Sequence, residues 1–256
     1  MTTPDDAGLR LEHDGAIARI TLDRPAQHNA LRSEEVAAFR RYLDDVETRD
    51  GTRVLVLTGA GDRTFCSGAS LDQMERGEMS GAIFETVTDR LARLRIPTIC
   101  ALNGDAYGGG AELALCCDFR VGPADMHLSV PAARLGVCYP VGGLGRYVRR
   151  LGLGAASRIL LANEELGGDE LYRIGFLTHL ADRDRVCREA DALAARLAAL
   201  APLAVQGMKR IMLQASESSL DAEEAERLIA RAAGSEDVRE GLRAARERRN
   251  PDFRGR

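Results

Sequence analysis

Tryptophan is absent from this sequence of 256 residues, and phenylalanine and tyrosine bring the aromatic content to only 4%. Aromatic platforms that stack on single-stranded nucleic acid are therefore not expected. The formal net charge of −4 argues in the same direction, because nucleic-acid-binding proteins are usually basic. We predict no nucleic-acid partner.

Long hydrophobic runs are also missing. No stretch approaches the ~20 apolar residues that a membrane helix needs, and Met1–Asp14 lacks the basic start and apolar run of a secretory signal. The six cysteines form no C-x-x-C pair and lie mostly in apolar contexts, which is typical of reduced, buried thiols. These features predict a cytoplasmic protein with no membrane segment.

Several signatures of cofactor and nucleophile chemistry are lacking. The four histidines are scattered without metal-ligand spacing, so no metal site is predicted. A phosphate-binding G-x-x-x-x-G-K-[ST] loop and a G-x-S-x-G nucleophile elbow are both absent.

The residues that are present describe an ordinary globular chain, 45% hydrophobic and 29% charged. Short apolar segments at Gly15–Asp23, Val54–Thr58, Thr98–Leu102 and Phe119–Val121 predict strands. Between and after them, apolar residues recur at helical spacing, with Ser33 as the N-cap of the first helix. Helices are predicted over 34–46, 82–94, 111–117, 144–151, 155–162 and 169–174, and then over 185–200, 202–215, 221–233 and 235–248. The fold class is therefore α/β with a helical C-terminal region.

Two glycine-containing turns are the most informative local features. Gly108, Gly109 and Gly110 lie between a predicted strand and a predicted helix, where free N–H groups can stabilise negative charge. A second turn, Phe65–Leu71, follows another strand by a short loop. Either both are structural turns, or each supplies one N–H to a single oxyanion site.

The C-terminal segment Arg243–Arg256 is basic, with six arginines against Glu247 and Asp252. One interpretation is a solvated helix end, where cations are favoured by the helix dipole. The other is a phosphate contact for a ligand or for a neighbouring subunit.

Taken together, these segments resemble the crotonase superfamily, the enoyl-CoA hydratase/isomerase family. The matching motifs remain collinear over nearly the whole chain. They are Arg24-Pro25 with Asn29-Ala30-Leu31, Val54–Gly59, Phe65–Ala69, Pro97, Asn103-Gly104, Gly108–Ala114, Cys117-Asp118, Pro131, Leu135-Gly136, Gly142-Gly143, Arg146 and Phe253.

The resemblance implies a spiral of β-β-α units with a helical C-terminal region. Residues 1–195 would form the spiral core for acyl-CoA binding and catalysis, and residues 196–256 a trimerisation region. The implied assembly is a homotrimer or a dimer of trimers. The implied substrate is an acyl-CoA thioester, with coenzyme A as part of the substrate and no separate cofactor.

The resemblance also assigns roles at the site. The backbone N–H groups of Ala69 and Gly109 would hold the thioester oxygen as it gains enolate charge, and Glu112 would be the general acid and base. The implied substrate-binding residues are Gln27, His28, Ala30, Cys66, Ser67, Gly68, Ser70, Leu71, Gly108, Ala132, Tyr139, Gly142 and Arg248.

One departure from the family pattern bears directly on the reaction. The second glutamate of the family's hydratases should follow Pro131, but that position holds Ala132, whose methyl group cannot deliver a proton. Tyr139, His127, Asp105 or a water held by Glu112 are the candidate substitutes. Arg134 and Tyr139 are alternatively placed to recognise a polar acyl group. Two further departures, Ala26 and Ser70, fall in the CoA-binding turns.

The leading prediction is hydration of a trans-2-enoyl-CoA. Enoyl-CoA isomerisation or acyl-CoA decarboxylation by Glu112 alone stays open, as does a non-catalytic acyl-CoA-binding protein, because of Ala132.

Overall fold

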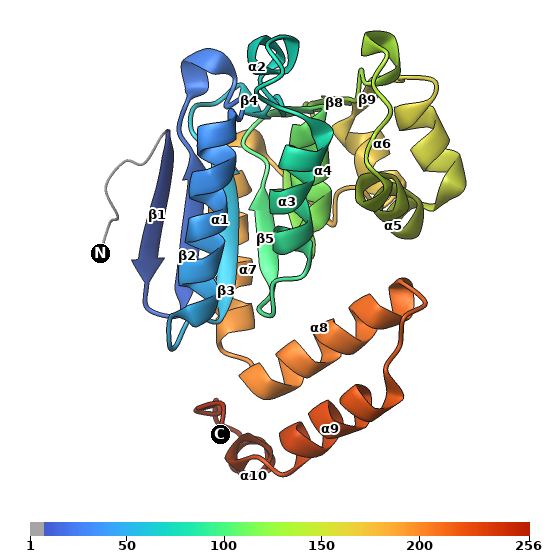
Figure 1. Cartoon of the computed structure of the whole chain (residues 1–256). Coiled ribbons are helices and arrows are strands. Elements are labelled where there is room, and N and C mark those ends of the chain that lie inside the picture. The colour runs from blue at the N-terminus through green and yellow to red at the C-terminus, as the bar shows by residue number, and fades with distance from the viewer. Residues whose placement is uncertain (1–7) are drawn as a thin grey trace.

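The computed structural model of the chain describes residues 8–256; the first seven residues of the Met1–Asp14 segment lie outside the described residues. Its larger sheet has six strands in the order β1-β2-β3-β5-β7-β10 (Figure 1). Only β1 runs antiparallel to its neighbour, and the other strands pair in parallel. The strands are β1 (Leu9–Asp14), β2 (Ile17–Leu22), β3 (Val54–Gly59), β5 (Thr98–Ala101), β7 (Phe119–Pro123) and β10 (His179–Ala181).

The chain also forms a smaller sheet of four short strands, which lies above the large sheet in Figure 1. Its order is β4-β6-β8-β9, and the strands are β4 (Thr64–Cys66), β6 (Asp105–Tyr107), β8 (His127–Ser129) and β9 (Leu166–Gly167). Chain segments pass from the large sheet to the small one and then into a helix, as in β3-β4-α2 (Leu71–Glu75) and β5-β6-α4 (Gly109–Cys116). These are the predicted β-β-α units. A glycine-containing turn therefore follows a small-sheet strand in each of these two units.

Helices cover both faces of the large sheet because its central strands are apolar on both sides. Leu55 and Leu57 of β3 pack into the main core beneath α1 (Ser33–Thr48), α3 (Gly81–Ala92) and α4 (Gly109–Cys116). The alternate residues Val54 and Val56 pack with α7 (Val186–Ala198) on the opposite face. A continuous apolar strand is what burial on two faces requires.

The N-terminus of α1 corrects one expectation. Ser33 was predicted as the N-cap, but Ser33 is the first helical residue and Arg32 occupies the cap position. The buried Glu35 carboxylate accepts the Arg32 backbone N–H at 2.7 Å and also pairs with the Arg32 guanidinium. A carboxylate at the third helical position thus accepts the N–H of the cap residue itself, whereas a serine cap would accept an N–H from within the first turn.

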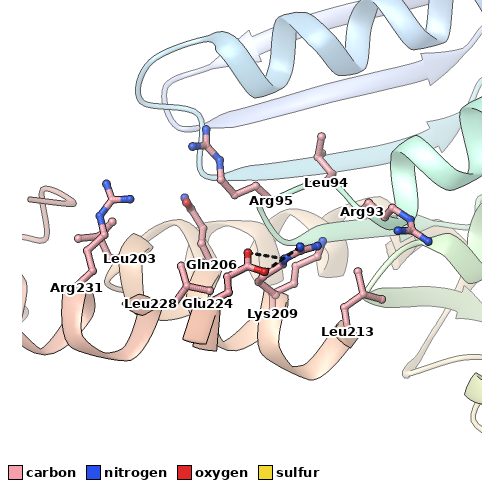
Figure 2. Close-up of a pocket in the computed structure, with 12 residues that line it drawn as sticks. Arg93, Leu94, Arg95, Leu203, Gln206, Lys209, Leu213, Glu224, Leu228 and Arg231 are labelled. Carbon is pink, nitrogen blue, oxygen red and sulfur yellow. Dashed lines mark hydrogen bonds and ion pairs between the residues drawn. The ribbon is translucent and has the colours of Figure 1, made fainter. Parts of the chain in front are cut away.

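The C-terminal helices α8 (Pro202–Ser216), α9 (Ala222–Ala233) and α10 (Glu236–Glu247) lie below the sheets (Figure 1). Lys209 anchors α8 to the core, because its Nζ donates to the Ile96 carbonyl at 2.7 Å and to Asp118 at 2.6 Å. Beside it, a cation-rich cavity of about 310 Å³ separates the 93–95 loop from α8 and α9 (Figure 2). The boundary predicted between residues 195 and 196 falls inside α7, and the division into core and trimerisation region stays a prediction.

The remaining helices are short or bent. The two helices predicted at 144–151 and 155–162 are both present within α5 (Val141–Leu160), which Gly152 interrupts with a non-helical backbone, φ +77°. The others are α2 (Leu71–Glu75), α6 (Gly168–Arg173) and the single 3-10 turns η1 (Pro25–Gln27), η2 (Ala133–Leu135) and η3 (Arg183–Arg185). Within residues 8–256, no helix combines the length and the apolar character needed to cross a membrane.

Candidate active site

The two glycine-containing turns identified in the sequence touch one another. A side-chain carbon added to Gly68 would lie 2.5 Å from the backbone nitrogen of Gly109, so only glycine fits. Gly68 also has a φ of +87°, which L-residues rarely adopt. Leu31 holds this turn in place: its N–H donates to the Gly68 carbonyl and its carbonyl accepts from Ser70, both at 2.8 Å.

Contact between the turns leaves two backbone donors free. Gly109 is the first residue of α4, where no intrahelical acceptor exists for its N–H. The hydrogen bonds between Leu31 and the Gly68–Ser70 segment skip the Ala69 N–H. Across residues 8–256, neither of these two N–H groups donates a hydrogen bond. Both residues line the same cavity, so the two donors are available to a ligand oxygen there.

This cavity has a volume of about 320 Å³ and a largely apolar wall. It is built from four chain segments: the 67–74 turn and helix, the start of α3, the start of α4, and the 131–140 loop. The lining residues are Ser67, Ala69, Leu71, Met74, Ser80, Gly81, Phe84, Tyr107, Gly108, Gly109, Glu112, Pro131, Ala132, Leu135, Val137, Tyr139 and Pro140.

Glu112 is the one carboxylate among these lining residues, and its residue is only 2% exposed. It projects from the first turn of α4, the helix that begins at Gly109. Gly143 of α5 closes over it, since a side-chain carbon there would lie 2.9 Å from Glu112 Oε1. Burial raises the pKa of Glu112, and the neighbouring Arg146 opposes that rise. A buried carboxyl with a raised pKa is suited to exchange protons near neutral pH.

Arg146 connects this carboxylate to two residues of α3. Its Nη2 lies 3.2 Å from Glu112 Oε1, 3.3 Å from Thr88 Oγ1 and 3.1 Å from Asp89 Oδ1. Its Nε is buried without a hydrogen-bond partner. The guanidinium is therefore fixed behind Glu112, outside the set of cavity-lining residues.

The turns predicted to bind CoA lie beside the Gly68 turn. The Ser67 N–H donates to the His28 carbonyl at 3.0 Å, and the His28 ring nitrogen Nδ1 lies 3.0 Å from Thr64 Oγ1. Gln27 and His28 are exposed and Ala30 is half-buried, so these residues border the cavity region without lining it.

Cys66 belongs to the wall behind the site. It is fully buried, burial raises the pKa of its thiol to about 12, and its Sγ–H donates to the Asn29 carbonyl at 3.2 Å. Cys66 does not line the cavity. Its thiol instead ties the 27–31 loop to the Gly68 turn.

Two other predicted contact residues, Gly142 and Arg248, do not line the cavity in this chain. The Gly142 N–H donates to Glu85 Oε1 at 2.9 Å. Arg248 follows the last turn of α10, at the end of the molecule opposite α2 and β4 (Figure 1). Arg243, Arg249, Arg254 and Arg256 pair with carboxylates, whereas Arg246 and Arg248 make no ion pair within residues 8–256.

The three side chains that are candidates for a second proton-transferring group differ in whether they line the cavity. Tyr139 lines the cavity; His127 and Asp105 do not. Asp105 accepts hydrogen bonds from Tyr107 and from the His127 backbone. Arg134 is exposed and also outside the lining, which leaves Tyr139 as the polar group of the 132–140 segment that faces the substrate space.

Sequence reasoning missed one wall of the cavity. Met74, Ser80, Gly81 and Phe84 come from α2 and α3, and Phe84 packs so closely on Gly109 that a side-chain carbon there would lie 2.6 Å from its ring. Nothing in their local pattern distinguishes these residues from ordinary helix positions.

Comparison with known proteins identifies the family. The sequence matches the enoyl-CoA hydratase/isomerase family over residues 12–256. It is 33% identical to 2,3-dehydroadipyl-CoA hydratase of Escherichia coli over 93% of this chain and 94% of that protein. It is 34% identical to carnitinyl-CoA dehydratase of Proteus mirabilis over 97% of this chain and 98% of that protein. The crystal structure of an enoyl-CoA hydratase from Mycobacterium tuberculosis superposes with a TM-score of 0.87 at 30% identity, covering 97% of this chain and 99% of that one.

The fold and the site therefore define an acyl-CoA-processing enzyme. The chain belongs to the enoyl-CoA hydratase/isomerase family of the crotonase superfamily.

Proposed function

We propose that this protein hydrates a trans-2-enoyl-CoA thioester. The observation that carries the proposal is the placement of two free N–H groups, from Ala69 and Gly109, in the cavity that also contains the buried Glu112. Two donors at one oxygen stabilise the negative charge that develops when the thioester becomes an enolate.

In this mechanism a water oxygen bonds to Cβ while the π electrons move toward the thioester oxygen. Glu112 takes a proton from that water. The Ala69 and Gly109 N–H groups hold the resulting enolate oxygen. Collapse of the enolate then draws a proton from the Glu112 carboxyl to Cα, which restores the carbonyl and the carboxylate. A single carboxylate balances both proton transfers, so Ala132 does not exclude hydration.

Isomerisation is the second candidate, favoured by the absence of a second carboxylate from the cavity lining. Glu112 alone would move a proton from Cα of a 3-enoyl thioester to Cγ. The same absence leaves decarboxylation, and acyl-CoA binding without turnover, as further alternatives.

Product analysis separates these functions. The protein is incubated with crotonyl-CoA and, separately, with trans-3-hexenoyl-CoA. Hydration removes the absorbance of the conjugated crotonyl thioester and adds the mass of one water. Isomerisation instead creates a conjugated thioester of unchanged mass from the 3-enoyl substrate. Binding of both thioesters without any product would overturn the enzymatic proposals.

Assembly and location are part of the same proposal. A homotrimer or dimer of trimers would place Arg248, which is free of ion pairs within residues 8–256, near the CoA phosphates of a neighbouring subunit. We also propose a cytoplasmic enzyme. It would use no cofactor beyond the CoA of its substrate, since a carboxylate and two N–H groups supply the proton transfer and the charge stabilisation.

A further inference from the structure

Besides Glu112, the polar side chains that line the cavity include that of Tyr139. Tyr139 lies in the loop between η2 and α5 and lines the cavity together with Glu112 and Ala132. Its ring packs edge-on against Tyr147, with centroids 6.3 Å apart and planes at 86°. Tyr147 is fully buried, so this contact fixes the Tyr139 ring against a rigid part of the core.

The Tyr139 hydroxyl is uncommitted. It makes no hydrogen bond within residues 8–256, whereas the other tyrosine of the cavity, Tyr107, donates to Asp105 at 3.0 Å. Burial raises the pKa of Tyr139 well above that of an ordinary phenol, and the nearby Glu112 charge adds to the rise. The hydroxyl therefore keeps its proton and remains a hydrogen-bond donor.

We propose that the Tyr139 hydroxyl binds the oxygen that is added at Cβ, in the place of the missing second carboxylate. This inference rests on the proposed hydration. During hydration the phenol O–H donates to one lone pair of the attacking water, while Glu112 accepts a proton from that water and the other lone pair bonds to Cβ. In the reverse direction Glu112 returns a proton to the departing oxygen, which leaves as water, while the same O–H donates to that oxygen. The phenol keeps its proton throughout, so the proton balance set by Glu112 is unchanged.

The substitution Tyr139→Phe removes this hydrogen bond and keeps the ring. We expect kcat for crotonyl-CoA hydration to fall about 10- to 100-fold, the effect of one hydrogen bond to a developing charge. KM should stay within about twofold, because the ring still fills the cavity wall.

Tyr147→Phe is the matched control. The Tyr147 hydroxyl is also buried without a hydrogen-bond partner, but Tyr147 does not line the cavity. Its removal should leave kcat within about twofold.

A second measurement separates catalysis at Cβ from general disruption of the site. Exchange of the α-protons of butyryl-CoA in deuterated water reports enolate formation, which needs Glu112 and the two N–H groups but no oxygen at Cβ. Tyr139→Phe should retain this exchange while losing hydration.

Equal loss of exchange and hydration in Tyr139→Phe would show a structural role and overturn the inference. Unchanged hydration would also overturn it and would leave hydration itself intact, with the water held by Glu112 alone. If the wild-type protein exchanges the α-protons but does not hydrate crotonyl-CoA, the proposed function and this inference both fail.

Discussion

Glu112 and Arg146 form an ion pair inside the protein, with Oε1 and Nη2 3.2 Å apart and both side chains less than a tenth exposed. The pair sets two opposing effects on one carboxyl group. Removal from water raises the pKa of Glu112, and the positive charge of Arg146 lowers it. The resulting pKa of Glu112 lies above the ordinary glutamate value. Arg146 keeps that pKa from rising further and so favours the ionised carboxylate at working pH.

Removing this charge should therefore move the pH dependence of the enzyme. In Arg146→Met the lowering effect of the guanidinium is lost while desolvation remains the largest influence, so the pKa of Glu112 rises further. Because the base must be ionised, the acidic limb of the kcat/KM profile should shift upward by about one pH unit or more. The profile is measured with crotonyl-CoA between pH 5 and pH 9.

Arg146→Lys is the control, since it preserves the positive charge behind Glu112. Its acidic limb should stay near that of the wild type even if stability falls. An unshifted limb in Arg146→Met would show that Arg146 does not tune Glu112.

The contact between the Gly68 turn and the Gly109 turn leaves no room for a side chain at Gly68. In Gly68→Ala the new methyl group would meet the Gly109 nitrogen at 2.5 Å and force the turns apart. The Ala69 and Gly109 N–H groups would no longer donate to one oxygen, so kcat should fall about 100-fold or more.

Gly51→Ala is a matched control for this change. Gly51 has a similar φ of +83°, but a side-chain carbon there meets nothing within 4 Å. Both variants should lose about 1 kcal/mol of unfolding free energy through backbone strain. Gly68→Ala should lose more because of the clash, and only Gly68→Ala should lose turnover. Loss of activity in both would attribute the effect to strain instead.

Asn29 predicts a stability effect. Its side chain is buried, accepts the Arg24 N–H at 3.0 Å, and donates to the carbonyls of Ala60 and Thr64 at 3.0 and 2.9 Å. Asn29→Ala leaves these three backbone groups without their hydrogen-bond partner. The loss should cost about 2–4 kcal/mol of unfolding free energy, measured in urea titrations. Asn29→Asp keeps the acceptor but places a buried carboxylate oxygen against the Ala60 and Thr64 carbonyls, so it should lose at least as much. Wild-type stability in Asn29→Ala would show that water replaces the amide.

The apolar cavity wall predicts a preference among acyl groups. No lysine or arginine lines the cavity within residues 8–256, and Arg146 is already paired. A terminal carboxylate on the acyl chain would lose water without gaining a cation. We expect kcat/KM for 2,3-dehydroadipyl-CoA to be about 100-fold or more below that for trans-2-hexenoyl-CoA, which has the same chain length. Similar values would mean that a terminal carboxylate reaches solvent or a cation.

The sequence predicted features that a few adjacent residues determine. The apolar run Val54–Thr58 and the glycine turn before Glu112 are local signals, and both occur where expected. The β-strands of the small sheet have only two or three residues each, too few for a period to appear. They form because the neighbouring large sheet positions them.

The residues of the site also divide into those that local motifs could predict and those that only the fold brings together. Ala69, Gly109 and Glu112 could be named because they lie in motifs, whereas Phe84 reaches the cavity only through the packing of α3 on α4. Among the alternatives for the second polar group, composition could not rank Tyr139 above His127 or Asp105. Only the three-dimensional arrangement shows which of these side chains lines the cavity together with Glu112.

The most direct measurement compares crotonyl-CoA turnover by the wild-type protein and by Glu112→Gln, with thioester binding measured for both. We predict that the wild type forms 3-hydroxybutyryl-CoA. Glu112→Gln should bind the thioester equally well, with kcat lower by about 10²- to 10⁴-fold, the range expected for loss of a general base. Equal turnover by both proteins would contradict the account, and so would a wild type that binds crotonyl-CoA without forming product.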